Sequence, residues 1–276
     1  MSRFSLNQAT IKHADLETAV RVTAEAGIES IGLWREPVAE AGLEHSARVV
    51  RDAGLRVSSL CRAGFFTMAE EPARRAALDD NRRAIEETAA LGAPTLVLVA
   101  GGLPEGSRDL VGARARVGEA LAELEQDALA AGVQLAIEAL HPMYVTDRAV
   151  VSTLGQALDL AAPFDARAVG VVVDTFHIFW DPAVLDQIAR AGAEGRIATY
   201  QVCDWNMPIA ADPLLSRGYP GDGLIDFASL TRAVVDAGYE GDIECEIFNQ
   251  EIWDAEPAPV AARARAAYEN LVEPHL

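Results

Sequence analysis

The amino-acid sequence predicts a single (β/α)8 barrel domain over residues 1–276, and three observations favour this fold class. Eight short runs rich in Val, Ile and Leu alternate with longer stretches rich in Ala, Arg and Glu. The short runs are nearly continuous in apolar residues, which is typical of parallel strands buried on both faces. No glycine-rich turn follows the first run, whereas a doubly wound open sheet, the alternative α/β fold, usually has one there.

The expected elements follow one another in a regular order along the chain. The eight expected strands are FSLNQAT from Phe4, SIGLW from Ser30, LRVSSLC from Leu55, TLVLVA from Thr95, VQLAIEAL from Val133, AVGVVVD from Ala168, IATYQVC from Ile197 and DIECEIF from Asp242. Three stretches carry apolar residues at helical spacing: LETAVRVTAEAGI, ALDDNRRAIEETAALGA and LGQALDLAA. Five glycines are expected to end helices in the left-handed conformation: Gly27, Gly54, Gly92, Gly132 and Gly238. The longest irregular stretch, 204–226, is expected to be a loop on the functional side of the barrel.

Composition excludes several classes of protein. The chain has 23 Lys and Arg against 42 Asp and Glu, a net charge of −19, which argues against a nucleic-acid partner or an anionic membrane surface. No apolar run approaches the roughly 18 residues of a membrane span, and the first residues lack the apolar core of a signal peptide. The three cysteines have no C-x-x-C spacing. We therefore expect a cytoplasmic protein with neither a disulfide framework nor a thiolate zinc site.

Four consecutive predicted strands end in a polar residue. These residues are Glu138, Asp174, Gln201 and Glu246, separated by 36, 27 and 45 residues, so only closure of a barrel would bring them together. Three carboxylates in a small space repel one another unless a cation or protons neutralise them. Oxygen ligands that include an amide carbonyl favour Mn²⁺ or Mg²⁺, with Co²⁺ or Zn²⁺ as the alternatives. The sequence therefore predicts a site for one divalent cation.

Further candidate residues lie close to these strand ends. His177 follows Asp174 by three residues and is expected to bind substrate. His141 follows Glu138 by three; its unperturbed pKa of about 6.5 suits a general base, although simple packing against Pro142 is equally compatible with its position. Arg217 on the long loop is a candidate for binding a sugar hydroxyl or a carboxylate.

Two other residues near the strand ends complete the candidate set. Trp34 is a candidate wall of a sugar pocket because its apolar ring suits the C–H face of a sugar. Glu244 lies on the same strand face as Glu246 and is expected one layer deeper, in a structural role. Lys12 is the only lysine. Its place in the loop after the first strand argues against a Schiff-base aldolase.

Several segments of the chain resemble the xylose-isomerase-like barrel superfamily of sugar isomerases and epimerases. They are IEALHP, VDTFH, the Q-x-x-D that begins at Gln201, the R-x-x-P-G-x-G that begins at Arg217, and E-x-E, and the resemblance covers essentially the whole chain. It implies that Glu138, Asp174, residue 201 and Glu246 hold one divalent ion, and that His177 and Arg217 bind substrate. Residue 201 is glutamine where the family usually has histidine, so we expect the metal preference to shift away from zinc.

The resemblance also implies a reaction. A metal-dependent isomerase or epimerase of this family moves a proton next to a carbonyl through an enediolate, with Glu138 and Glu246 as the proton carriers. The alternatives are a lyase of the same fold, similar to inosose dehydratase or to subunits that cleave 3-oxo-glycosides with a small partner subunit, or a non-catalytic sugar-binding relative. A nuclease of the endonuclease IV type is disfavoured by five histidines and the negative charge. The expected partner is a small carbohydrate, and a homo-oligomer remains open.

Overall fold

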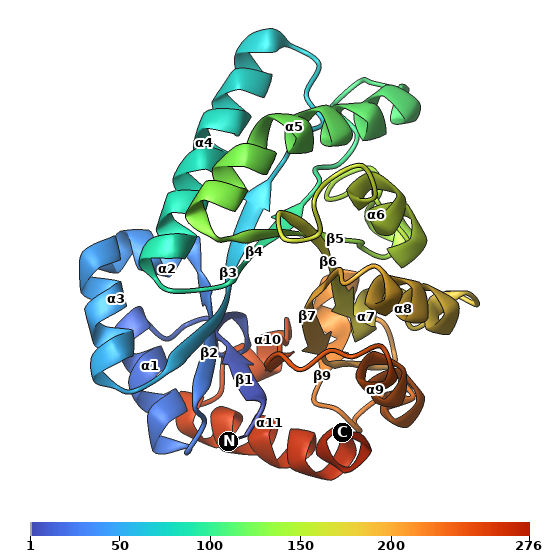
Figure 1. Ribbon diagram of the computed structural model, residues 1–276. Helices are drawn as coiled ribbons and strands as arrows, with labels where there is room; N and C mark the ends of the chain where they lie inside the picture. The colour runs from blue at the N-terminus through green and yellow to red at the C-terminus, as the bar shows by residue number, and fades with distance from the viewer. Residues whose placement is uncertain (1) are drawn as a thin grey trace.

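The structure, a computed structural model, describes residues 2–276 and contains a closed ring of eight parallel strands (Figure 1). The barrel strands are β1 (Phe4–Asn7), β2 (Ser30–Trp34), β3 (Arg56–Gly64), β4 (Thr95–Val99), β5 (Gln134–Glu138), β6 (Val169–Asp174), β7 (Ile197–Val202) and β10 (Ile243–Cys245). The ring closes because β1 pairs with β2 on one side and with β10 on the other. This closure confirms the (β/α)8 barrel and excludes the open sheet.

Helices surround the ring on the outside (Figure 1). They are α1 (Leu16–Glu25), α2 (Arg35–Ala41), α3 (Leu43–Asp52), α4 (Glu71–Ala90), α5 (Leu110–Ala131), α6 (Leu154–Ala161), α7 (Thr175–Ile178), α8 (Val184–Ala193), α9 (Phe227–Asp236), α10 (Gln250–Trp253) and α11 (Pro257–Leu271). Short 3-10 turns are η1 (Gln8–Ile11), η2 (Pro142–Tyr144), η3 (Pro213–Ser216) and η4 (Glu273–His275). The last long helix, α11, packs on α1 and β1 and so completes the outer layer. No helix within residues 2–276 is both long and apolar enough to cross a membrane.

The alternation of side chains along the strands divides the core into two parts. Outward-facing strand residues and the helices form one large apolar cluster. A small second cluster of buried residues fills the ring itself: Cys61, Val97, Ala136 and Val172. Because side chains on one strand face recur every second residue, the residues two positions further along β5 and β6 also point into the ring. Those residues are Glu138 and Asp174.

The element boundaries differ from the sequence predictions at both ends of the chain. The first strand ends at Asn7, whose side chain accepts a hydrogen bond from the backbone N–H of Ala9 at 3.0 Å and so begins the η1 turn. The last barrel strand is three residues long, although the Glu246 N–H still donates to the Val202 carbonyl at 3.3 Å. The five glycines expected to end helices all have φ between +67° and +83°, which confirms that prediction.

The stretch 204–226 is more ordered than the predicted loop. It contains a two-stranded antiparallel pair, β8 (Asp204–Trp205) and β9 (Arg217–Gly218). The buried carboxylate of Asp204 accepts hydrogen bonds of 2.8–2.9 Å from four backbone N–H groups, those of Trp205, Gly221, Gly223 and Ile225. A Cβ at Gly223 would lie 2.2 Å from the Trp205 carbonyl oxygen, so this close approach requires glycine. This stretch is thus an ordered structure held by hydrogen bonds, and it places Arg217 at the mouth of the barrel.

Candidate active site at the barrel mouth

The four residues predicted from the strand ends all belong to one layer of the barrel interior. Each stands two positions beyond a residue buried inside the ring: Glu138 beyond Ala136, Asp174 beyond Val172, Gln201 beyond Thr199, and Glu246 beyond Glu244. All four side chains are buried, with 5% or less of their surface exposed. The sequence therefore places four polar groups together at the carboxyl end of the strands, where barrel enzymes carry their active sites.

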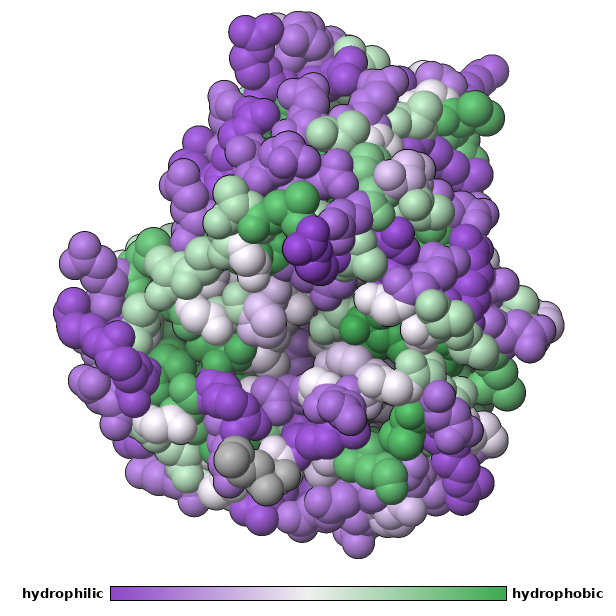
Figure 2. Space-filling view, viewed as in Figure 1, coloured by the Kyte–Doolittle hydropathy of each residue, from purple (hydrophilic) through white to green (hydrophobic). Residues whose placement is uncertain are grey.

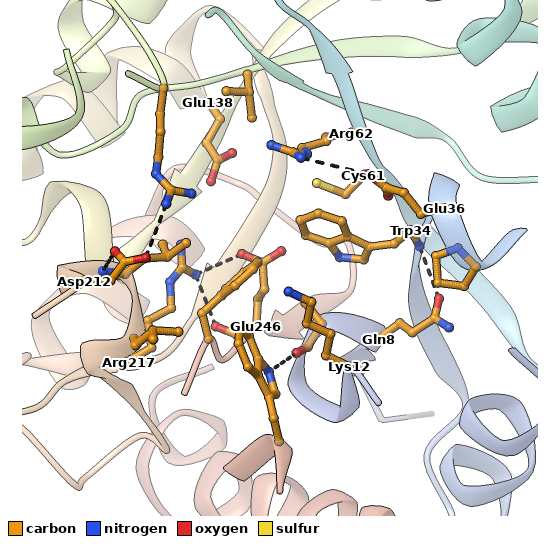
Figure 3. Close-up of a pocket in the computed structure, with 18 of the residues that line it drawn as sticks. Gln8, Lys12, Trp34, Glu36, Cys61, Arg62, Glu138, Asp212, Arg217 and Glu246 are labelled. Carbon is orange, nitrogen blue, oxygen red and sulfur yellow. Dashed lines mark hydrogen bonds and ion pairs between the residues drawn. The ribbon is translucent and has the colours of Figure 1, made fainter. Parts of the chain in front are cut away.

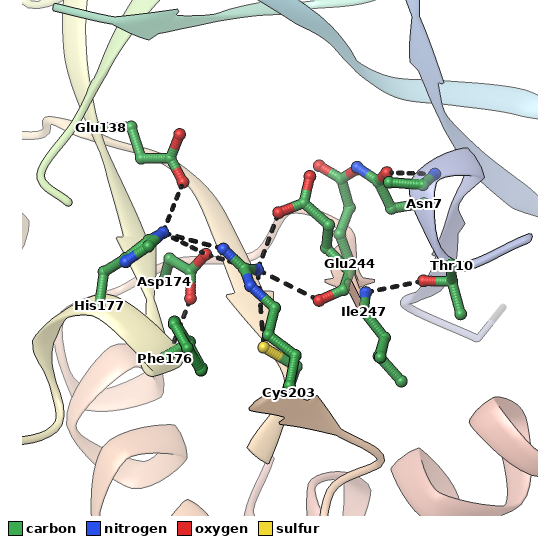
Figure 4. Close-up of polar contacts among 12 residues, drawn as sticks. Asn7, Thr10, Glu138, Asp174, Phe176, His177, Cys203, Glu244 and Ile247 are labelled. Carbon is green, nitrogen blue, oxygen red and sulfur yellow. Dashed lines mark hydrogen bonds and ion pairs between the residues drawn. The ribbon is translucent and has the colours of Figure 1, made fainter. Parts of the chain in front are cut away.

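Arg217 and His177 connect the three carboxylates of this layer. Figure 4 shows His177 beside Glu138 and Asp174. Arg217 Nη1 lies 2.9 Å from Glu246 Oε2 and 3.1 Å from Asp174 Oδ2. His177 Nε2 lies 3.8 Å from Glu138 Oε1 and 4.0 Å from Asp174 Oδ2. Ligating atoms of Glu138, Asp174 and His177 all lie within 4.8 Å of one another, close enough to hold one metal ion. This group of potential ligands contains His177, which the sequence assigns to substrate, and does not contain Glu246, which joins the cluster through Arg217. The ligand set predicted from the sequence therefore stays a prediction.

Gln201 lies beside Asp174 and has unused hydrogen-bonding groups. It pairs with Asp174 in the β6–β7 register, so the two side chains share a strand face. Its side-chain oxygen and nitrogen are both buried, and neither has a hydrogen-bond partner. Asp174 Oδ2 is likewise without a hydrogen bond, although it is in ion-pair distance of Arg217. Buried polar atoms without partners are rare in folded proteins, and an oxygen-binding cation would satisfy these two oxygens.

The charges of the cluster also fit a divalent cation. Burial, followed by repulsion from Glu246 and Asp174, raises the pKa of Glu138 well above its ordinary value. Burial also raises the pKa of Asp174, and it raises the pKa of Glu246 to about 7, while Arg217 opposes both shifts. When all three carboxylates are ionised, the single charge of Arg217 leaves the cluster at −2. One divalent cation would neutralise that charge, so the residues present fit such an ion.

His177 is held as a neutral ring between two hydrogen-bond donors. Burial and the adjacent Arg217 guanidinium lower the pKa of His177 well below its ordinary value. The backbone N–H of His141 lies 3.2 Å from its Nδ1, and Arg217 Nη2 lies 2.8 Å from its Nε2. A neutral imidazole has one lone pair and can accept from only one of these donors. The other donor is therefore without its acceptor until a further oxygen, such as one of a ligand, enters the site.

The cluster opens into a cavity of about 920 Å³ at the mouth of the barrel. Glu138, His177, Arg217 and Glu246 line it, and Figure 2 shows the hollow on the face toward the viewer, bordered by both apolar and polar residues. Trp34 lines the cavity as predicted (Figure 3). Its indole nitrogen donates to Asn7 Oδ1 at 2.8 Å, which fixes the plane of the ring. The volume suits a small organic ligand.

Three of the candidate residues, Asp174, Gln201 and His141, do not line the cavity. Asp174 and Gln201 lie buried beneath it, whereas His141 lies to one side. Its half-buried ring packs against Trp180 and Trp205, with ring centres 5.4 and 5.3 Å apart. Burial lowers the pKa of His141. Its backbone N–H reaches His177, but its ring is not brought together with the carboxylates, so a role for the ring as a general base remains a prediction.

The chain matches a protein-family model described as xylose isomerase-like TIM barrel over residues 20–271. The chain belongs to the xylose isomerase-like TIM barrel family. Among curated members it is 29% identical over 137 residues to the inosose isomerase of Bacillus licheniformis, an alignment covering 49% of this chain and 47% of that protein. This chain thus spans about half the length of that relative. It is also 26% identical over 254 residues to the L-ribulose 3-epimerase of Mesorhizobium japonicum, covering 89% of this chain and 80% of the epimerase.

A solved structure resembles this member of the family more strongly. The crystal structure of protein SMc04130 from Sinorhizobium meliloti 1021 has 45% sequence identity and a TM-score of 0.95, and the alignment covers 98% of both chains. The two chains therefore share one fold over nearly their whole length.

Several residues that line the cavity were not predicted from the sequence. Phe65, Phe248 and Trp253 form apolar walls, and Lys12 and Arg62 also line the cavity. Phe65 and Phe248 stand just after strand ends, so the rule that identified the carboxylates could have identified them too. Arg62 directly follows the expected strand run, which ends at Cys61, and belongs to β3 in the structure. Only the structure shows that it faces the mouth.

Proposed function

We propose that the protein is a divalent-metal-dependent isomerase or epimerase of a small carbohydrate. The observation that carries the proposal is a buried cluster of three carboxylates with Gln201, Arg217 and His177, of which Glu138, His177, Arg217 and Glu246 line the mouth cavity. The names of the curated relatives, an inosose isomerase and an L-ribulose 3-epimerase, support the same class of reaction. The reaction is the movement of a proton at a carbon next to a carbonyl.

In this proposal Glu138, Asp174, Gln201 and Glu246 hold the cation, with Mn²⁺ or Mg²⁺ preferred because every donor is an oxygen. The cation, when bound, supplies Lewis acidity that makes a C–H next to a carbonyl more acidic. Zinc is disfavoured because it usually takes histidine or cysteine ligands. His177 is the remaining nearby nitrogen, and we assign it to a substrate oxygen.

The two glutamates are the proton carriers in the proposal. They come from β5 and from the end of β10, with β6 and β7 between them in the ring, so a substrate held over the cluster has a carboxyl group on each side. The pKa of Glu246, raised to about 7, suits a base that must gain and lose a proton near neutral pH. Arg217 donates to Oε2 of Glu246 at 2.9 Å and so orients this carboxylate.

The test is solvent deuterium exchange followed by proton NMR. Ketoses, inososes and 3-oxo-glycosides are incubated in D₂O with MnCl₂ or MgCl₂, and the loss of one C–H signal next to the carbonyl is recorded. We expect exchange in at least one compound, loss of exchange in Glu246→Gln, and unchanged exchange in Glu240→Gln, an exposed glutamate. Loss of a leaving group during exchange would identify a lyase. No exchange with any compound would indicate a sugar-binding protein and contradict the proposal.

A further inference from the structure

Two cationic side chains besides Arg148 and Arg217 line the cavity. Lys12 follows the η1 turn, and Arg62 lies near the end of β3. Both line the cavity, and Figure 3 shows both pointing into it. Lys12 is the only lysine in a chain of net charge −19, so a cation at this position is not a consequence of an overall basic composition.

Lys12 has an aromatic neighbour but no acidic one. Its Nζ lies 4.4 Å from the centre of the Trp253 ring, an arrangement that attracts a cation to the ring face. Within residues 2–276, Lys12 forms neither an ion pair nor a side-chain hydrogen bond. Its three N–H donors are therefore available to a ligand in the cavity.

Arg62 also keeps most of its hydrogen-bonding capacity. Its guanidinium carbon lies 5.7 Å from the centre of the Trp34 ring and 5.2 Å from that of Phe65. The one carboxylate at ion-pair distance is Glu36, 3.9 Å away and 61% exposed, which is too long for a hydrogen bond and too exposed for a strong pair. Its Nε is buried and has no hydrogen-bond partner. The planar guanidinium is thus oriented by two rings and presents free donors.

The other two arginines of the cavity are already neutralised. Arg217 is paired with Asp174 and Glu246, and Arg148 lies 3.5 Å from Asp212 and 3.6 Å from Asp147. Positive charge without a close partner is therefore concentrated at Lys12 and Arg62. Arginine and lysine donors bind carboxylates and phosphates through short, charge-assisted hydrogen bonds.

We propose that Lys12 and Arg62 bind an oxyanion of the substrate, so that the substrate is a sugar acid or a sugar phosphate rather than a neutral sugar. This inference rests on the proposed function, because it places the reacting carbonyl at the carboxylate cluster and the anionic end of the same molecule at Lys12 and Arg62 in the same cavity. It assigns Lys12 and Arg62 to substrate binding and selection, not to proton transfer.

The test compares three compounds that differ only at C6: D-fructose, D-fructuronate and D-fructose 6-phosphate. Their dissociation constants are measured by isothermal titration calorimetry with saturating MgCl₂. We expect at least one of the two anions to bind about tenfold or more tightly than D-fructose, and the preferred anion identifies carboxylate or phosphate as the group bound. Lys12→Met and Arg62→Met should each remove most of this preference while changing D-fructose binding less than about threefold.

Matched variants separate a binding role from a structural one. Lys12→Arg keeps the charge and should keep the preference, and Arg51→Met, an exposed arginine on α3, should leave all three constants unchanged. Glu36→Gln should increase the preference, because it removes the acidic group nearest to Arg62. Equal binding of the three compounds, no measurable binding of either anion, or a preference that persists in the Lys12→Met/Arg62→Met double variant would overturn the inference.

The measurement also distinguishes failure of this inference from failure of the proposed function. Binding does not require turnover, so an anion preference without deuterium exchange in any compound would leave the anion site standing and contradict the isomerase. Exchange in a neutral ketose without any anion preference would support the isomerase and contradict the anion site.

Discussion

Two buried carboxylates two residues apart, Glu244 and Glu246, have very different surroundings. Glu244, in the deeper layer, accepts hydrogen bonds from Asn7 at 3.1 Å, from Ser59 at 2.8 and 3.1 Å, and from Thr199 at 3.2 Å. A Cβ at Gly32 would lie 1.9 Å from Glu244 Oε2, so the chain approaches this carboxylate closely. Every oxygen of Glu244 is thereby satisfied by the protein itself.

In the layer of Glu246, by contrast, several buried polar groups have no hydrogen-bond partner. Both side-chain polar atoms of Gln201, Asp174 Oδ2 and Arg217 Nε are buried without hydrogen-bond partners. His177 faces two donors with one lone pair. Buried polar groups cost free energy unless they are paired. We therefore expect a bound ion or ligand to pair with the unpaired groups of this layer. The comparison therefore separates a structural carboxylate from candidate catalytic ones on the same strand.

The largest expected effect is the loss of activity in Glu246→Gln. The amide cannot take a proton from carbon, so we expect deuterium exchange to fall by about 10³-fold or more. The midpoint of thermal unfolding should stay the same or rise, because the substitution removes a buried carboxylate whose pKa burial raises to about 7. Exchange at the wild-type rate would remove Glu246 from the proton-transfer role.

Glu244→Ala should have the opposite effects: it should lower the stability of the protein and leave the exchange rate nearly unchanged. It leaves the donors of Asn7, Ser59 and Thr199 without their acceptor, so we expect the free energy of unfolding to fall by about 3 kcal/mol. The exchange rate per folded molecule should remain within a few-fold of wild type. Urea denaturation measures the first quantity, and Glu240→Ala, an exposed control, should change it by less than about 0.5 kcal/mol. A stable but inactive Glu244→Ala would contradict the division between the two layers.

Divalent cations should stabilise the protein more at alkaline than at acid pH. The pKa of Glu246 in the folded chain is about 7 against an ordinary 4.5, so the stability that this group contributes is present at low pH and is lost as pH rises through that window. A cation competes with the proton for the same carboxylates. The increase in unfolding midpoint on adding MnCl₂ should therefore be larger at about pH 8 than at about pH 5.5. An equal increase at both pH values would place the cation elsewhere.

The smallest effect is expected from Gln201→His. Replacing an oxygen donor by an imidazole nitrogen should shift the relative affinity toward Zn²⁺ or Co²⁺ over Mn²⁺ by about tenfold. Competition titrations with a metal-sensitive dye measure this ratio. An unchanged ratio would mean that residue 201 is not a ligand.

The sequence predicts the barrel and its polar layer for definite reasons. Period-two alternation is encoded locally in each strand, and barrel closure follows from the strand–helix alternation repeated along the whole chain, which is why Glu138, Asp174, Gln201 and Glu246 could be identified together. The position of the His141 ring against Trp180 and Trp205 could not be predicted from the sequence, because it depends on packing between separate loops. The same holds for Arg62 and Lys12, whose orientation toward the cavity is fixed by contacts with rings of other elements. Arg217 was identified, but its burial was not, because the stretch 204–226 was expected to be a loop and is instead ordered around Asp204.

The most direct test of the central claim is a crystal structure of the protein soaked with MnCl₂, with anomalous diffraction recorded at the manganese absorption edge. Our account predicts one strong peak at the barrel mouth, bound by carboxylate oxygens of Glu138, Asp174 and Glu246 and by the side-chain oxygen of Gln201. A peak held by other residues, or a map with no peak at this position, would contradict it.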